Sequence, residues 1–266
     1  MKIGIPVLNR GDLLLRLVNS VDVEAEVLVI VNSIGPVDPS VEDAVGDLES
    51  RERPGVRVCV ERMAGNLGVS GSWNRIIEKF GGDCIVSNSD IEFAPGILRQ
   101  AMATIESRKE IVIHHLWAAA CFYVTAEFPA KLGWYDENFY PAYHEDQELS
   151  LRSVAMGVRR TVVPGIPKEG IVHGGSQSRK SASEAVQTYL RRAKGIAGDY
   201  IRRRWGELPP PGVGTPEKKY PFDDPSIHPA EWTLDLDARK RVAAICKEVT
   251  GFDCPILYHR TKGGLG

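Results

Sequence analysis

The sequence has few cysteines, no long apolar run and little net charge, and each of these features excludes a class of protein. Its five cysteines are odd in number, widely spaced and without a Cys-x-x-Cys pair, which argues against a disulfide framework and a zinc ribbon. A formal net charge of −2 excludes a globally basic nucleic-acid binder. No apolar run approaches a membrane span, and the first residues lack a signal-peptide pattern. We therefore expect reduced, mostly buried thiols and a cytoplasmic protein without a membrane span.

Two nucleotide-binding signatures are missing as well. The glycine-spaced loop Gly65–Asn74 enters an expected helix, yet it has no lysine of the phosphate-binding P-loop type and does not match the dinucleotide fingerprint. An ATPase or a dehydrogenase is therefore disfavoured. The glycines of this loop suit a turn, with Ser70 or Ser72 as the helix N-cap. The functional alternative is a nucleotide that lies against the loop and is faced by Asn74.

What the chain does contain is an alternation of short apolar runs with segments of helical spacing. With 266 residues, 43% of them hydrophobic, the chain is long enough to bury a substantial core. The pattern predicts strands at residues 2–8, 27–31, 56–60, 83–87, 111–115 and 121–125, and helices near 13–18, 72–80 and 95–107. Continuous apolar strands are typical of a parallel sheet with helices on both faces. The fold class expected is α/β.

Polar residues follow several of these strands. Ligands of open α/β sheets bind at the carboxyl ends of the strands, so we expect Asn9, Asn32, Asn66 and residues 88–90 to converge on one cleft. Asp90 follows an apolar strand, where a carboxylate can hold a divalent cation, although Asn-Ser-Asp is equally typical of a turn or cap. His173 follows an apolar pair and precedes glycines. A lone histidine is usually structural, but an imidazole and a carboxylate together can share a cation with a diphosphate.

The segment Gly133–Gly157 carries two adjacent acids, Glu145 and Asp146, after an aromatic-rich turn and at the start of an expected helix. Asp146 is a candidate general base. The alternative is that it only caps the helix or pairs with Arg152. Trp134 is either a core aromatic or a face on which a sugar stacks.

The C-terminal part is predicted to be mostly helical. Residues 184–205 form an expected amphipathic helix, residues 206–230 are rich in proline and glycine, and a last helix is expected at 236–249. The polar face of the first helix is basic, with Arg191, Arg192, Lys194, Arg202, Arg203 and Arg204. Such a face is commonly only solvated. The alternative is an anionic acceptor: nucleic acid with a modified base, a phosphorylated glycan or a lipid phosphate.

Taken in order, these pieces resemble the GT-A glycosyltransferases of the family-2-like group. The resemblance covers about residues 1–180 and rests on residues 5–10, 66–74, 88–90, 133–139, 145–149, Arg152 and His173-Gly174-Gly175-Ser176. It implies a GT-A (Rossmann-like) mixed, mostly parallel sheet flanked by helices in a domain of residues 1–180. Residues 181–266 are then a C-terminal helical extension with a proline-rich covering segment.

The resemblance also implies roles. It gives a metal-dependent hexosyl- or pentosyltransferase, generally inverting, that moves a sugar from a nucleoside diphosphate sugar to a glycan, lipid-linked sugar, protein or modified nucleic acid. Asp146 is implied as general base, and Asp90 and His173 as ligands of Mn²⁺ or Mg²⁺. Beside the resemblance, Trp134 is a candidate acceptor contact through its aromatic face, and Glu145 is an acceptor-side or structural neighbour of the base. The implied donor-binding residues are Pro6, Asn9, Asn32, Asn66, Gly68, Asn74, Asn88 and Ser89. The chain departs from the family pattern at Asn88, where the first Asp of Asp-x-Asp is expected, and around residues 31–33, where an acidic residue is usual.

Two other function classes stay open. A nucleotidyltransferase acting on sugar phosphates also uses an α/β sheet and metal-bound carboxylates, but this sequence has no glycine-rich, Arg- and Lys-bearing N-terminal loop to grip a triphosphate. A non-catalytic sugar-nucleotide or carbohydrate-binding module is the second alternative, because fold does not fix function.

Overall fold

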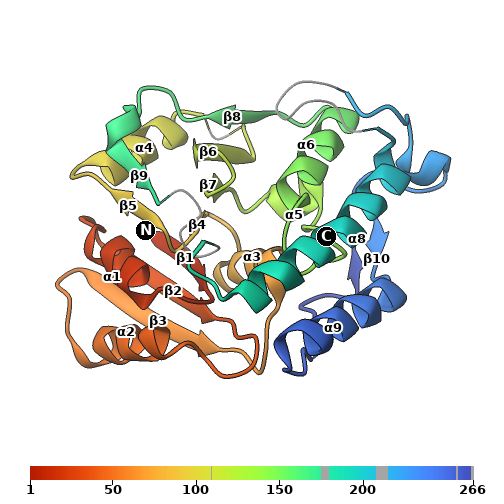
Figure 1. Ribbon diagram of the computed structural model, residues 1–266. Coiled ribbons are helices and arrows are strands. Elements are labelled where there is room, and N and C mark those ends of the chain that lie inside the picture. The colour runs from red at the N-terminus through yellow and green to blue at the C-terminus, as the bar shows by residue number, and fades with distance from the viewer. Residues whose placement is uncertain (109, 175–179, 208–214, 256, 265–266) are drawn as a thin grey trace. The chain divides into compact units, whose positions relative to one another are not determined.

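The computed structural model describes residues 1–108, 110–174, 180–207, 215–255 and 257–264, which form two compact units (Figure 1). Unit 1 consists of residues 1–65, 75–126 and 160–183, and unit 2 of residues 66–74, 127–159 and 184–266. The expected C-terminal extension therefore falls in unit 2 almost entirely, together with two earlier segments. The domain boundary at residue 180 stays a prediction.

Unit 1 is built on a seven-stranded sheet. Its order is β3 (Val56–Arg62), β2 (Ala25–Val31), β1 (Lys2–Val7), β4 (Cys84–Ser87), β7 (Cys121–Val124), β6 (Ile113–Trp117) and β8 (Arg160–Val162). Strands β1 to β4 pair in parallel, β7 is antiparallel to both of its neighbours, and β8 is parallel to β6. The expected mixed, mostly parallel sheet is confirmed.

Helices cover both faces of this sheet, which explains its uninterrupted apolar strands. Ile3, Ile5 and Val7 of β1 belong to one buried cluster with residues of α1 (Gly11–Asn19), α2 (Pro39–Ser50) and α4 (Ile97–Glu106). On the other face Gly4 touches α3 (Gly68–Phe80) so closely that a Cβ there would lie 2.1 Å from the Ile76 side chain. Because neither face meets water, period-two alternation is lost.

Several elements of the structure were not predicted from the sequence. Among them are α2, the short strands β5 (Ile91–Phe93), β8 and β9 (Ile171–His173), and α5 (Phe128–Leu132). Helix α2 begins at Pro39, and Asp38 caps it by accepting from the backbone N–H of Ser40. The strands have three residues each, which is too short for a periodic pattern.

Unit 2 is mainly helical in its described part. It contains α5, α6 (Glu145–Ala155), α8 (Glu184–Trp205), α9 (Leu236–Thr250) and an antiparallel pair of β10 (Trp232–Thr233) with β11 (Lys262–Gly263). Phe139, Leu151, Tyr200, Ile201 and Trp205 are part of a buried cluster that joins α6 to α8. The first half of α3, to Asn74, counts with this unit. The predicted proline run 209–211 lies outside the described residues.

The cysteines agree with the expectation of reduced, mostly buried thiols. All five cysteines are free thiols, and four of them are buried, with Cys59 exposed. Across the described ranges no helix combines the length and apolar character that crossing a bilayer requires.

Candidate functional site

In unit 1, polar residues gather at the carboxyl edge of the parallel strands. Asn9 comes two residues after β1, and Asn32 follows β2 directly and donates its backbone N–H to the Val7 carbonyl oxygen (2.8 Å). Asn88 follows β4, and its backbone N–H donates to the Ala120 carbonyl oxygen (2.7 Å). Because β2, β1 and β4 are parallel neighbours, their ends meet at one edge. Asn32 and Ser89 are buried there, and Pro6, inside β1, is half-buried.

Asp90 and His173 are brought together by two short strands. β5 pairs antiparallel with β9, so that His173 lies opposite Ile91, and the Gly174 N–H donates to the Asp90 carbonyl oxygen (2.7 Å). As a result the His173 Nε2 atom lies 3.5 Å from Asp90 Oδ1. The Asp90 side chain is 5% exposed and that of His173 is 23% exposed. Of the predicted His-Gly-Gly-Ser motif, Gly175 and Ser176 lie outside the described residues.

The donor atoms of this pair suit a divalent cation. Two ligands that are each about 2.1 Å from one ion are at most about 4.2 Å apart, so the observed separation of 3.5 Å is compatible with shared coordination. Carboxylate oxygen and imidazole nitrogen are both ligands of Mn²⁺-type ions. No group of three or more His, Cys, Asp and Glu residues gathers within the described ranges. A cation held by Asp90 and His173 therefore needs further ligands from a diphosphate or from water.

The glycine-spaced loop in unit 2 is held by its own polar groups. Asn66 Oδ1 accepts from the Gly68 N–H (2.8 Å), and Gly68 has a φ of 74°, where a Cβ would lie 2.8 Å from the Tyr140 ring. Asn74 is fully buried; its amide nitrogen donates to the Tyr135 carbonyl and to Glu137, and its Oδ1 accepts from the Tyr135 N–H. These bonds give Asn74 a structural role, and its contact with a donor stays a prediction.

The acids in the segment Gly133–Phe139 also bind protein groups. Glu137 accepts from the backbone N–H groups of His259 and Arg260 as well as from Asn74, and burial raises its pKa. Asp136 accepts from the Tyr200 hydroxyl (2.6 Å), and burial raises its pKa too. Sequence reasoning did not assign these two acids a structural function. Both acids lie between Tyr135 and Phe139, and this position among aromatic residues is the sequence feature that indicates burial.

Helix α6 places its two leading acids in different surroundings. Tyr143 and His144, which precede the helix, both have left-handed backbone conformations, with φ of 85° and 71°. Glu145 is buried at 9% exposure, and its Oε2 has no hydrogen-bond partner among the described residues. Burial, and next the nearby Asp146 charge, raise the Glu145 pKa to about 8. Asp146 is exposed, and its Oδ1 accepts from the Gln147 N–H (2.8 Å).

A buried charge cluster beneath these acids fixes α6 to α8. Arg152 and Arg204 both contact the Glu148 carboxylate, and the Trp205 indole donates to it (3.3 Å). Burial alone would raise the Glu148 pKa, but the two guanidinium groups outweigh burial and lower it. Arg152 therefore pairs with Glu148 rather than with Asp146. Arg204, expected on the basic face of α8, is fully buried, which corrects that assignment.

Two further features bear on the predicted site. The Arg260 guanidinium lies 3.7 Å from the centre of the Trp134 ring and covers part of this half-buried candidate acceptor contact.

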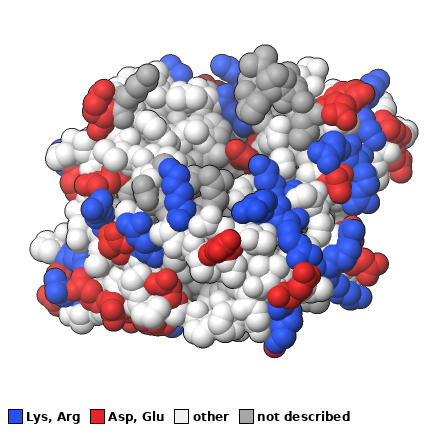
Figure 2. Space-filling model, viewed as in Figure 1, with Lys and Arg blue, Asp and Glu red and all other residues white. Residues whose placement is uncertain are grey.

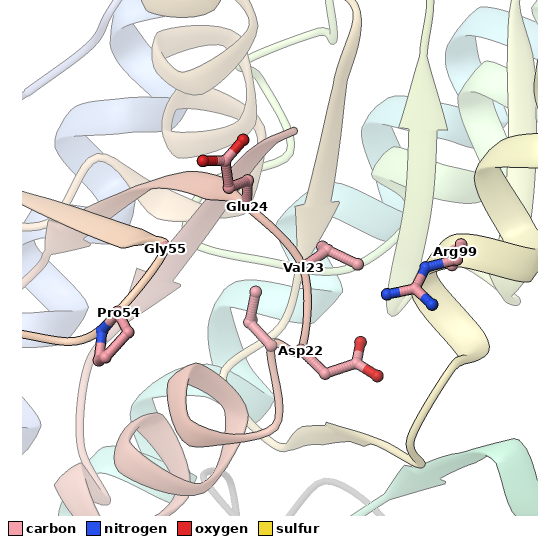
Figure 3. A pocket seen from close by; sticks show the side chains of 7 residues that line it. Asp22, Val23, Glu24, Pro54, Gly55 and Arg99 are labelled. Carbon is pink, nitrogen blue, oxygen red and sulfur yellow. The ribbon is translucent and has the colours of Figure 1, made fainter.

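A surface hollow in unit 1, toward which Asp22 and Arg99 point, lies at the amino ends of β2 and β3 (Figure 3). It is thus at the edge of the sheet opposite to Asn9 and Asn32.

Comparison with known proteins gives one family and several structures of similar fold. The model of glycosyl transferase family 2 matches residues 2–152, which is more than half of the chain. A search of the curated proteins found no match. The chain has a TM-score of 0.52 and 15% identity to a mannosyltransferase, PcManGT, from Pyrobaculum calidifontis, solved in complex with GDP-Man and Mn²⁺, with 79% of this chain and 66% of that one covered.

Two other structures have a TM-score of 0.50. S. aureus TarS 1-349 in complex with UDP-GlcNAc is 13% identical, with 95% of this chain and 74% of that chain covered. GalNAc-T7 with UDP, GalNAc and Mn²⁺ is 14% identical, with 76% and 50% covered. In another structure of S. aureus TarS 1-349 the match spans 57% of the solved chain. At these identities the likeness concerns the fold. Together with the family match and the mixed, mostly parallel sheet, it shows that this chain belongs to glycosyl transferase family 2 and has the GT-A fold.

Proposed function

We propose that the protein transfers a hexose or pentose from a nucleoside diphosphate sugar to an acceptor hydroxyl, with inversion at the anomeric carbon. The observation that carries this proposal is the Asp90–His173 pair, whose Oδ1 and Nε2 atoms lie 3.5 Å apart beside the carboxyl end of β4. Family membership supports it from the sequence side. The complexes of PcManGT with GDP-Man and of TarS with UDP-GlcNAc make nucleoside diphosphate sugars the donors to test first.

The donor nucleotide is assigned to the carboxyl edge of unit 1. Pro6, Asn9 and Asn32 are proposed to hold the nucleoside, and Asn88 and Ser89 the ribose and adjoining phosphate. Asparagine side chains can both donate and accept hydrogen bonds, which suits a ligand with base, ribose and phosphate oxygens. Asn66, Gly68 and Asn74 of unit 2 complete the proposed set, although Asn66 Oδ1 and the Asn74 amide already have partners in the protein.

Asp90 and His173 are proposed to hold Mn²⁺ or Mg²⁺. A divalent cation supplies positive charge that stabilises the departing diphosphate without a proton. The protein's part is to keep the Asp90 carboxylate and the His173 imidazole at a separation that suits one ion, through the pairing of β5 with β9.

Asp146 is proposed as the general base. Its carboxylate is exposed at the first turn of α6, so a solvent-delivered acceptor hydroxyl can reach it. By taking the hydroxyl proton it would raise the nucleophilicity of the attacking oxygen. Glu145 is proposed as its acceptor-side neighbour, and Trp134 as an aromatic contact for the acceptor. A cytoplasmic location remains a prediction.

A thermal-shift screen of nucleoside diphosphate sugars, with and without Mn²⁺, tests the proposal and identifies the donor. A ligand at a hundred times its dissociation constant stabilises the folded protein by about 2.7 kcal/mol. The product then discriminates between function classes. Slow release of UDP or GDP is the expected result. Release of pyrophosphate would favour a nucleotidyltransferase, and binding without any turnover would favour a non-catalytic module.

A further inference from the structure

The basic residues of α8 have different surroundings. Some form ion pairs with acids of other elements, whereas others are exposed and form no such pair. In Figure 2, Lys and Arg side chains follow the line that α8 takes in Figure 1. Arg192 pairs with Glu248 (2.7 Å), Arg203 approaches Asp235 (3.6 Å), and Arg204 is buried against Glu148. Within the described residues, Lys194 forms no ion pair, and Arg202 pairs only with Asp199 of its own helix.

Lys194, Gly198 and Arg202 form one row along this helix. They are spaced by four residues, which places them on the same face. Gly198 leaves a gap in the row: a Cβ there would lie 3.6 Å from Arg202 Nη1 and 3.6 Å from His144 Nε2. Two nitrogen-bearing side chains from α8 and from the start of α6 therefore converge on the space that a side chain at residue 198 would occupy.

The His144 ring is oriented so that its outer nitrogen faces this gap. His144 Nδ1 lies 3.0 Å from Gln147 Oε1, and because an amide oxygen only accepts, Nδ1 is the donor in this hydrogen bond. The Nε2 atom is left directed at the gap beside Gly198. On protonation, Nε2 becomes a second donor aimed at the same point as the Arg202 guanidinium.

Lys194 links the row to the segment that leads into the candidate base. Its ammonium group lies 5.1 Å from the centre of the Tyr143 ring. Tyr143 and His144 hold left-handed conformations immediately before Glu145 and Asp146. The three cationic or protonatable groups thus border the start of α6.

We propose that His144, Lys194 and Arg202 form a site around Gly198 for a phosphate group carried by the acceptor. Phosphate matches this set because it offers several acceptor oxygens and up to two negative charges, and charge-assisted hydrogen bonds to such groups are the strong ones. The exposed pair of Arg202 with Asp199 is weak enough to yield to it. This inference rests on the proposed function, since it names the acceptor of the reaction assigned to Asp146.

Two glycines of α8 provide a matched test of the geometry. Gly198→Ala fills the gap with a methyl group at ordinary contact distance and strengthens the helix, so the variant folds. Gly195→Ala makes the same change at an exposed position where a Cβ would meet nothing within 4 Å. Lys194→Gln and Arg202→Gln test the charges, with Arg192→Gln as the control for a basic residue on the same helix.

The readout is the NMR shift of the His144 ring proton during titration with inorganic phosphate at constant pH and ionic strength, assigned from His144→Gln. We expect a saturable shift in the wild type and in Gly195→Ala and Arg192→Gln. Gly198→Ala, Lys194→Gln and Arg202→Gln should each weaken binding by at least about tenfold, as expected for loss of a charge-assisted contact. No saturable shift in the wild type, or equal affinities for Gly198→Ala and Gly195→Ala, would overturn the proposal.

Competition distinguishes the sources of the phosphate. Glycerol phosphate stands for a soluble phosphorylated acceptor, and phosphatidylcholine vesicles with added phosphatidic acid stand for a lipid phosphate. Displacement of inorganic phosphate from His144 by either one supports the site and names its source, whereas displacement by neither contradicts it. Nucleoside diphosphate release by the wild type is measured separately. If nucleoside diphosphate is released but phosphate does not bind, only this inference is wrong. If phosphate binds but no nucleoside diphosphate is released, the proposed function is wrong.

Discussion

Glu145 and Asp146 are neighbours in the chain with opposite environments, and the difference separates their roles. Glu145 is buried with an unpartnered Oε2, and its pKa is raised to about 8, so it is mostly protonated at neutral pH. Asp146 is exposed at the same helix start. An exposed carboxylate can accept a proton from an arriving hydroxyl, whereas a protonated acid cannot. The environment therefore favours Asp146 as the base.

Substitution of each acid by its amide tests this assignment. Asp146→Asn should fold normally yet lose sugar transfer by at least about a hundredfold, the lower range of general-base effects. Glu145→Gln mimics the protonated acid and should retain far more activity. Initial transfer rates and melting temperatures of both variants give the comparison. Near-normal turnover by Asp146→Asn, or a deeper loss in Glu145→Gln, would remove Asp146 from the mechanism.

The raised pKa of Glu145 also predicts a pH dependence of stability. The folded pKa of about 8 exceeds the ordinary value of 4.5, so the folded state binds the proton more tightly than the unfolded state. The contribution to stability is full below about pH 4.5 and is lost as pH rises toward about 8. Each unit between the two pKa values corresponds to about 1.4 kcal/mol.

Urea unfolding of the wild type and Glu145→Gln at several pH values measures this loss. Glutamine cannot ionise, so the stability difference between Glu145→Gln and wild type should shift in favour of the variant as pH rises from about 4.5 to about 8. A difference that is independent of pH over this window would show that Glu145 is not buried as an acid.

At the scale of elements, α6 and α8 are joined by their buried apolar cluster and by the ion pairs of one carboxylate. Glu148 neutralises the buried guanidinium groups of Arg152 and Arg204, which come from the two different helices. Removing one partner of a buried ion pair leaves uncompensated charge in a low-dielectric site. The start of α6, which carries the proposed base Asp146, is therefore supported by the buried ion pairs of Glu148 in the same first turn.

Glu148→Gln should accordingly lower the free energy of unfolding by about 3–5 kcal/mol. The matched control is Glu248→Gln, which breaks the exposed pair with Arg192 and should change stability by at most about 1 kcal/mol. Chemical denaturation of the two variants side by side measures both values. Similar small losses in the two would contradict a structural role for Glu148.

Sequence patterns predicted the longer elements and missed those whose partners lie far along the chain. The buried strands β1 and β2 and the helix α8 followed from apolar runs and helical spacing. Helix α2 was not predicted, although its Asp38-Pro39-Ser40 start is a readable helix signal. The pairing of β5 with β9 had none, because three residues show no period. The sequence pattern predicted Arg204 on the exposed basic face of α8. Its buried partner Glu148 is 56 positions away, so local spacing does not indicate their pairing.

At the scale of the whole molecule, the proposed roles divide between the two units. The proposed metal ligands Asp90 and His173 and most of the proposed donor-binding residues belong to unit 1, whereas Asp146, Glu145 and Trp134 belong to unit 2. The order of motifs along the chain predicted both sets. It did not predict that residues 66–74 and 127–159 group with the C-terminal helices, since that grouping depends on buried contacts such as Asn74 with Glu137.

The metal proposal is testable by substitution within unit 1. Asp90→Ala and His173→Ala should each weaken activation by Mn²⁺, seen as a higher Mn²⁺ concentration for half-maximal rate, because each removes a ligand. Glu92→Ala is the control, an exposed acid on β5 that lies two residues after Asp90 and pairs with Val172, the residue before His173. Unchanged Mn²⁺ activation in both ligand variants would place the cation elsewhere.

The most direct test of the whole account is the release of nucleoside diphosphate from the donor found by the thermal-shift screen, measured with Mn²⁺ and again in excess EDTA. The account predicts release of UDP or GDP together with a glycosylated acceptor or free sugar, and loss of that release in EDTA. Release of pyrophosphate, or equal turnover in EDTA, would contradict it.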